Sequence, residues 1–149
     1  MNSLFTQPDM DSIMKRLASL AAGSTRQWGK MTPSQALTHC SLVLETATGL
    51  KPVKQSFLGK IVTPFIRSTV LGDKPFGKNS PTDPKFVVSD AGEFETERKR
   101  LVGLLGRFQQ MGPEKIGQNE HSFFGRLTGD EWGRLQYKHI DHHLRQFGV

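Results

Sequence analysis

The sequence predicts an all-α fold, an antiparallel four-helix bundle with a helical and loop insertion between the second and third bundle helices. Start and stop signals delimit four helical segments. No segment shows the alternation of apolar and polar residues that marks a half-buried strand. A chain of 149 residues suits one domain over 1–149 and buries enough apolar surface to need no cross-links.

The first two helices are delimited by residues typical of helix ends. The first is expected over residues 8–22, where Gly23 follows. The second has Thr32 as its N-cap, a proline in its first turn and Gln35 three residues after the cap. This is a capping box, in which each side chain accepts a hydrogen bond from the other residue's backbone N–H. Gly49 is expected to end the second helix.

The third and fourth bundle helices have similar signals. The third is expected to begin at residue 89 or 90 and to stop at the Gly-Pro pair 112–113. The fourth has Thr128 as its N-cap and Glu131 reaching back, and it continues almost to the end of the chain. This last helix carries most of the histidines.

The insertion lies between the second and third bundle helices. Apolar pairs recur about every four residues over 57–71, which predicts a helix, and Pro64 is expected to kink or split it. Residues 72–86 then contain three prolines and little periodicity. An ordered loop of this length often borders a functional site, but a plain surface connection explains it equally well.

Composition and charge exclude several classes of protein. The single cysteine, Cys40, rules out a disulfide framework or a Cys-rich zinc site and is expected to be a small buried hydrophobic residue. Phosphate-loop, dinucleotide-binding, nucleophile-elbow and HExxH motifs are absent. The longest apolar stretch, 57–71, is interrupted by charge and proline and is too short to span a bilayer. With no secretory signal pattern, these features favour a soluble cytoplasmic protein without membrane contact.

The formal net charge of +6 could indicate binding to nucleic acid. The basic residues are scattered, however, and form no arginine-rich block. A solvated basic surface is therefore favoured, and a nucleic-acid partner is the weaker alternative. Basic groups around a pocket would instead favour an anionic substrate.

The last helix suggests the chemistry. His139 and His143 are four residues apart and therefore lie on one helical face. His39, in the second helix, is expected to point into the bundle, where it can join this pair. Three imidazoles leave an open coordination position, which is the arrangement of catalytic metal sites. Imidazole suits Zn, Ni, Cu or Fe, so the metal itself is not specified.

Four further residues are candidates for the surroundings of this site. Gln146, or a backbone carbonyl, is expected to hold a ligand histidine in place, and His142 is a supporting group or an alternative ligand. Trp132 is expected to help the 72–86 loop shape a pocket. His121 either rims that pocket or, more in keeping with its loop position, bonds locally to its own turn.

Three segments resemble one known family. The DinB-like superfamily is similar in two of them: its second-helix entry resembles residues 28–40 (WGKMTPSQALTHC), and its last-helix signature resembles residues 139–147 (HIDHHLRQF). The third segment, residues 86–95, is similar to the corresponding segment of a bacterial subgroup of unknown function. The resemblance implies an up-down-down-up bundle that binds a divalent metal through His39, His139 and His143. Relatives include metal-dependent transferases of low-molecular-weight thiols such as bacillithiol or mycothiol, and many are homodimers.

The leading hypothesis is thus a metal-dependent transferase that activates a small thiol. A hydrolase using metal-bound water is a second enzymatic option. The alternative is a metal- or ligand-binding module without catalytic turnover. The insertion over 72–86 departs from the better-known transferases, and the fold alone does not define the reaction.

Overall fold

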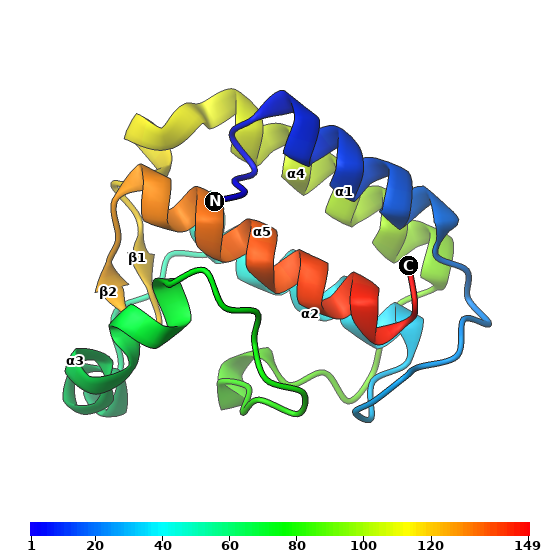
Figure 1. Ribbon diagram of the computed structural model, residues 1–149, viewed down its shortest axis with the longest axis horizontal. Coiled ribbons are helices and arrows are strands. Elements are labelled where there is room, and N and C mark those ends of the chain that lie inside the picture. The colour runs from blue at the N-terminus through cyan, green and yellow to red at the C-terminus, as the bar shows by residue number, and fades with distance from the viewer.

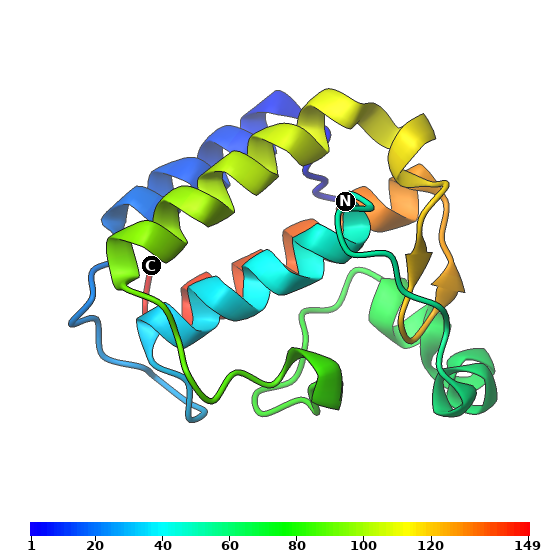
Figure 2. The same cartoon turned by 180° about the vertical axis from the view of Figure 1, so that it is seen from behind.

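The protein is mostly helical, and its helices α2, α4 and α5 pack as a bundle with α1 against α5. A computed structural model describes residues 1–149. The elements in chain order are α1 (Gln7–Ser19), α2 (Pro33–Ala47), α3 (Phe57–Leu71), the 3₁₀ turn η1 (Pro84–Phe86), α4 (Phe94–Ile116), β1 (Glu120–His121), β2 (Gly125–Arg126) and α5 (Gly129–Gln146). In Figures 1 and 2, α1 and α5 run in one direction, and α2 and α4 run in the other.

Both predicted capping boxes are present, and they begin the two helices that carry the candidate ligands. The Thr32 hydroxyl accepts a hydrogen bond from the Gln35 backbone N–H (3.2 Å), and the Gln35 side chain accepts one from the Thr32 N–H (2.9 Å). Thr128 and Glu131 make the same two bonds, at 3.2 and 2.8 Å. The starts of α2 and α5 are therefore determined by local hydrogen bonds.

The start of α4 differs from the predicted one, whereas its predicted stop at the Gly-Pro pair is present. The helix begins at Phe94 rather than at residue 89 or 90, because the Glu93 carboxylate is itself the N-cap and accepts the backbone N–H groups of residues 95 and 96. At the other end, helical structure resumes after a kink at Gly112 (φ 73°, ψ 167°) and continues to Ile116. The Gly-Pro pair therefore ends the long helix as predicted, and a short helical segment follows it.

The insertion contains the predicted helix, but the helix is not divided. Helix α3 runs continuously through Pro64, so of the two expected effects, a kink or a split, the split does not occur. The chain from 72 onward is a loop up to η1, and Lys138 of α5 donates hydrogen bonds to the carbonyls of Gly72 (2.8 Å) and Lys74 (3.0 Å). The first half of the loop is thus attached to the last helix.

A two-stranded antiparallel hairpin, β1 with β2, was not predicted. Each strand has only two residues, too few for an alternating pattern to be recognised. The turn is closed by the His121 ring, whose Nδ1 accepts the backbone N–H groups of Phe123 (3.0 Å) and Phe124 (3.2 Å). Gly125 then adopts a positive φ of 67°.

The apolar core is shared by the bundle helices and the hairpin. Leu44, Phe108 and Trp132 are completely buried in it. Cys40 also belongs to this core, as predicted, and burial raises the pKa of its thiol to about 12. The thiol therefore stays protonated at neutral pH.

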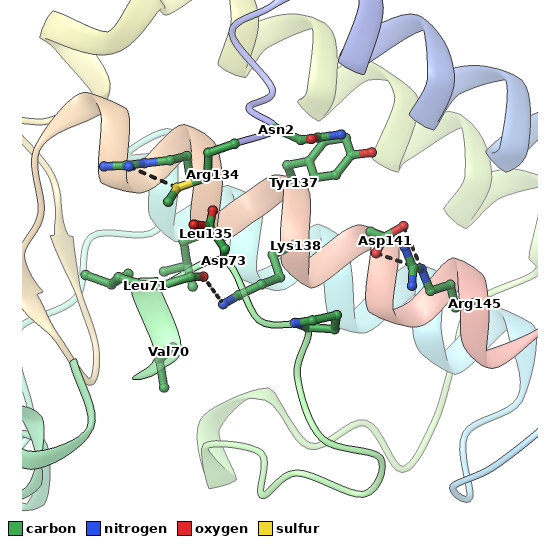
Figure 3. A pocket seen from close by; sticks show the side chains of 13 residues that line it. Asn2, Val70, Leu71, Asp73, Arg134, Leu135, Tyr137, Lys138, Asp141 and Arg145 are labelled. Atoms are coloured by element: carbon green, nitrogen blue, oxygen red, sulfur yellow. Dashed lines mark hydrogen bonds and ion pairs between the residues drawn. The ribbon is translucent and has the colours of Figure 1, made fainter. Parts of the chain in front are cut away.

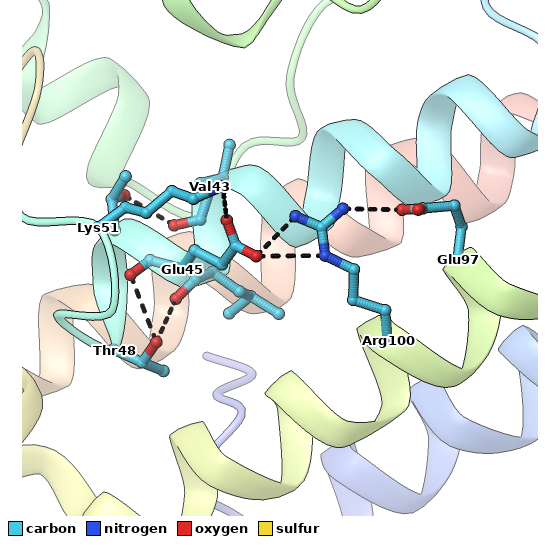
Figure 4. A network of polar contacts seen from close by, with 8 residues as sticks. Val43, Glu45, Thr48, Lys51, Glu97 and Arg100 are labelled. Carbon is cyan, nitrogen blue, oxygen red and sulfur yellow. Dashed lines mark hydrogen bonds and ion pairs between the residues drawn. The ribbon is translucent and has the colours of Figure 1, made fainter. Parts of the chain in front are cut away.

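An ion-pair network joins α2 to α4 (Figure 4). Glu45 lies between Lys51 (2.6 Å) and Arg100 (2.6 Å), and Arg100 also contacts Glu97 at 3.0 Å. Burial acts against the Glu45 carboxylate, but hydrogen bonds and charge from the two cations outweigh it and lower its pKa. This carboxylate is therefore ionised at neutral pH and links the two helices.

We expect Glu45→Gln to destabilise the protein by about 1–2 kcal/mol at pH 7, because charge-assisted bonds to two cations are lost. Urea unfolding monitored by circular dichroism measures the change. Glu95→Gln is the matched control, because Glu95 makes one ion pair within α4 and its side chain is 49% exposed. The control substitution should lower the free energy of unfolding by less than about 0.5 kcal/mol. Equal losses in the two variants would contradict the role of this network.

Candidate metal centre

The structure brings His39, His139 and His143 together. One possible ligand atom from each residue lies within 4.8 Å of those of the other two. The three ring centroids form a triangle with sides of 4.9 Å, and Nε2 of His39 lies 2.9 Å from Nε2 of His139. No other group of three or more His, Cys, Asp or Glu residues in the chain converges in this way.

The helices explain this convergence. His139 and His143 are one turn apart on α5, so their side chains leave the helix on the same face. Helix α2 packs against α5 and supplies His39, which is 3% exposed. His139 and His143 are only partly buried, so one side of the cluster borders the surface.

A backbone carbonyl orients His39. Its Nδ1 lies 2.8 Å from the carbonyl oxygen of Phe86, at the end of η1. A carbonyl can only accept, so Nδ1 must carry the hydrogen and Nε2 of the neutral ring has a free lone pair. That lone pair faces the other two histidines, as in metal sites where the second ring nitrogen holds the ligand in position.

Gln146 orients His143. The Gln146 Nε2 donates to the Trp28 carbonyl (3.0 Å), which leaves its Oε1 facing Nδ1 of His143 at 3.0 Å. His143 must therefore donate from Nδ1, and its Nε2 carries the lone pair. Gly29 makes room for this arrangement: its φ is 76°, and a Cβ atom there would lie 2.5 Å from the Gln146 amide nitrogen.

Hydrogen bonds alone do not satisfy His139. Its Nδ1 is buried without a partner. If Nε2 carries the hydrogen, it can donate to His39, but the Nδ1 lone pair stays unpaired. If Nδ1 carries it, a buried donor is unpaired and two Nε2 lone pairs face each other at 2.9 Å. With the His139 hydrogen on Nδ1, a cation bound at Nε2 of His39 and His139 would take up the two facing lone pairs.

The cluster fits a divalent ion in its chemistry and in its scale. Zinc–imidazole bonds of about 2.0–2.1 Å place tetrahedral ligand nitrogens roughly 3.4 Å apart. In the cluster, Nε2 of His39 and Nε2 of His139 are 2.9 Å apart, and the possible ligand atoms of all three residues lie within 4.8 Å of one another. This range includes the separation expected for a tetrahedral zinc site. The possible ligands are all imidazoles, which suit Zn, Ni, Cu or Fe. The group contains no carboxylate, the kind of ligand that suits Mg or Ca.

Electrostatics keep the three rings neutral. Loss of hydration lowers the pKa of His143 to about 3, with repulsion from His39 adding to the effect. The same two causes hold the pKa of His139 well below its ordinary value. Burial also lowers the pKa of His39, although the bond to the Phe86 carbonyl acts against it. Neutral imidazole is the form that binds metals, so the cluster needs no deprotonation at pH 7.

The other candidate residues lie around the cluster. The centroid of the His142 ring lies 5.3 Å from that of the His143 ring, 5.6 Å from that of Trp28 and 5.9 Å from that of Phe76. His121 bonds to its own turn, which lies at the hairpin. Trp132 is fully buried against His121, and its Nε1 donates to a backbone carbonyl at 3.3 Å. Neither His121 nor Trp132 belongs to the converging group.

Three contributors were missed in the sequence. Trp28 and Phe76 flank His142, and Phe86 supplies the carbonyl to His39. Phe76 and Phe86 both belong to the proline-containing loop, which the sequence indicates as a possible border of a site without pointing to particular residues in it. The backbone carbonyl leaves no signal, because any residue type provides one.

The 72–86 loop also borders a pocket of about 180 Å³ beside α5 (Figure 3). Its lining includes Asp73 of the loop and Arg134, Lys138, Asp141 and Arg145 of α5. None of the histidines lines it. The pocket and the histidine cluster are therefore separate features.

The family is shown by comparison with known proteins. A family model described as "Protein of unknown function (DUF1569)" matches residues 2–148. No curated protein and no solved structure matches the chain. Because the match covers nearly the whole sequence, the chain belongs to the DUF1569 family of proteins of unknown function.

Proposed function

We propose that the protein binds a divalent metal ion, Zn, Ni or Fe, through His39, His139 and His143. The observation that carries the proposal is the convergence of three neutral imidazoles, two of which are oriented by acceptors at Nδ1. The helix directions in Figure 1 and this ligand set also support membership of the DinB-like superfamily, with its up-down-down-up bundle.

We further propose that the protein is a transferase acting on a low-molecular-weight thiol. A bound divalent cation supplies Lewis-acid chemistry, which makes a thiol or a water molecule a stronger nucleophile near neutral pH. In the transfer, the thiol loses its proton, its sulfur bonds to an electrophilic carbon, and the leaving group departs with the electron pair. Use of water in place of the thiol would give hydrolysis.

The surroundings of the cluster favour an anionic thiol. Trp28 and Phe76 flank His142, all three side chains are half-buried, and each of the two aromatic rings has a lysine over it. Lys78 Nζ lies 5.1 Å from the Trp28 ring centroid, and Lys138 Nζ lies 4.7 Å from that of Phe76. Aromatic walls with ammonium groups suit a small molecule that carries carboxylates.

Metal analysis together with a thiol screen tests this proposal. Protein purified without a nickel column is expected to contain about one equivalent of a divalent metal by elemental analysis. Thiol-dependent consumption of a chloro-nitroaromatic electrophile is then measured with bacillithiol, mycothiol and glutathione, before and after metal removal. Metal without turnover would leave a binding module, and protein that neither retains nor takes up metal would overturn the assignment.

A further inference from the structure

We propose that α3 is a docking surface for the anionic surface of a lipid membrane. The proposal concerns the insertion and does not depend on the metal centre. It rests on an exposed apolar helix face, on the way the opposite face is attached to the protein, and on the position of the basic residues along the chain.

Helix α3 exposes four large apolar side chains. Phe57 and Phe65 are 80% exposed, Leu58 is 61% exposed and Ile61 is 51% exposed. At 100° per residue these four positions occupy an arc of about 100° on the helix. Figures 1 and 2 show α3 projecting from the bundle, beyond the hairpin. A contiguous exposed apolar face of this kind indicates an interaction site.

The opposite face of α3 is attached to the protein. Gly59 packs directly on the Phe123 backbone, where a Cβ atom would overlap the carbonyl oxygen. Thr63 donates to that same carbonyl at 2.9 Å, and Arg67 pairs with Glu131 of α5 at 2.8 Å. These contacts fix the rotation of the helix, so its apolar face points outward in the folded protein.

The positive charge lies on the same part of the chain. Residues 50–88 contain seven basic and two acidic residues, a net charge of +5, whereas the whole chain carries +6. Helix α3 itself has no acidic residue, and Lys60 is exposed at the edge of the apolar face. Three of these bases, Lys51, Lys54 and Arg67, form ion pairs with glutamates outside the segment. The charge beside the apolar face therefore comes from lysines without an ion pair, and Lys60 of α3 is one of them.

The charge on and near α3 indicates which kind of partner binds its apolar face. A second copy would bring the exposed Lys60 of two α3 helices together, and α3 has no acidic residue to pair with either lysine, which is electrostatically unfavourable. Nucleic acid would engage the cations but offers nothing to Leu58 and Ile61, because aliphatic side chains do not stack on bases as aromatic rings do. An anionic bilayer suits both the lysines, which would lie at the headgroups, and the apolar side chains, which would lie below the headgroups.

The expected binding is interfacial. None of the helices combines the length and apolarity needed to cross a bilayer. Helix α3 has 15 residues, with polar contacts to the protein on one face and apolar exposure on the other. Such a helix lies in the plane of the membrane surface.

Vesicle co-sedimentation of the full chain tests the proposal. We expect binding to phosphatidylcholine vesicles containing about 30% phosphatidylglycerol to exceed binding to pure phosphatidylcholine by about tenfold or more, and to weaken at high salt. Phe57→Ser combined with Phe65→Ser should reduce this binding about tenfold or more. Val102→Ser on α4, where Val102 is 40% exposed, is the control and should bind like the unchanged protein.

Other outcomes would overturn the proposal. These are failure to bind anionic vesicles, equal binding to neutral vesicles, or undiminished binding by the doubly substituted protein. A dimer in analytical ultracentrifugation that the two substitutions dissociate would assign the face to a second copy. Binding to duplex DNA that the substitutions abolish, without binding to lipid, would assign it to nucleic acid. Circular dichroism confirms that each variant is folded.

Discussion

Replacing His139 with alanine is expected to weaken zinc binding by about 100-fold or more, because one of three converging nitrogen ligands is lost. His143→Ala should have a similar effect for the same reason. Competition with a chromophoric chelator measures the affinity, and circular dichroism checks that the helices remain. The reduction should appear with zinc alone, so the measurement does not depend on knowing the substrate.

His142→Ala is the matched control for this experiment. His142 lies on the same helix, next to His143, but outside the converging group. Its removal should change zinc affinity by less than about threefold if it only flanks the site. Gln146→Leu should fall between the two, with a loss of about 10- to 100-fold, because Gln146 orients His143 without being a ligand. Equal losses in His139→Ala and His142→Ala would refute the assignment of ligands.

The parts of the structure that depend on local residue spacing could be predicted from the sequence. The capping boxes at Thr32 and Thr128 form as the motifs indicated, because their hydrogen bonds join residues only three positions apart. The pairing of His139 with His143 follows from the helical repeat alone. The approach of His39, 100 residues earlier in the chain, required the additional assumption that α2 and α5 pack together.

The parts of the structure that depend on a choice between several possible cap residues, or on contacts with backbone groups, could not be predicted from the sequence. Several acidic and polar residues near position 90 could cap α4, and only the folded chain shows that Glu93 does so. The hairpin is held by the His121 ring, which acts on backbone groups and leaves no periodic pattern. The bond from His39 to the Phe86 carbonyl depends on where a long loop returns to the bundle.

The exposure of α3 also lay outside sequence reasoning. The apolar repeat over 57–71 predicted a helix correctly, but the same pattern is typical of a helix that buries its apolar side. Here Gly59 and Thr63 are buried instead, while Phe57 and Phe65 face solvent. The helix could bury either its apolar face or the face with Gly59 and Thr63, and the contact with the Phe123 carbonyl selects the second. No residue pattern near α3 in the sequence indicates this contact.

The metal-free protein is expected to lose stability as the pH falls from 7 to 5.5. Three histidines dominate this effect. The pKa of His143 is lowered to about 3 and that of His121 to about 4, both mainly by burial, and the pKa of His139 is also well below 6.5. In the unfolded chain each of these groups titrates near 6.5, so the unfolded state binds protons that the folded state does not.

The sign of the change follows from this difference in proton binding. The stability that these groups contribute is complete above pH 6.5 and decreases as the pH falls, down to the folded-state pKa values. From pH 7 to 5.5 each group should remove about 1 kcal/mol, or about 3 kcal/mol together. Carboxylates such as Glu45, whose pKa is lowered from 4.5, contribute little in this window. Urea unfolding at both pH values, after dialysis against a chelator, measures the loss.

His143→Gln separates this mechanism from general acid sensitivity. The substitution removes one titrating group while keeping a polar side chain of similar length, so the loss between pH 7 and 5.5 should shrink by about 1 kcal/mol. The comparison is made within each variant, so any constant effect of the substitution on stability cancels. A loss that is the same in both proteins would mean that His143 is not held neutral by the fold, and that the cluster has to release a proton before it can accept a metal ion.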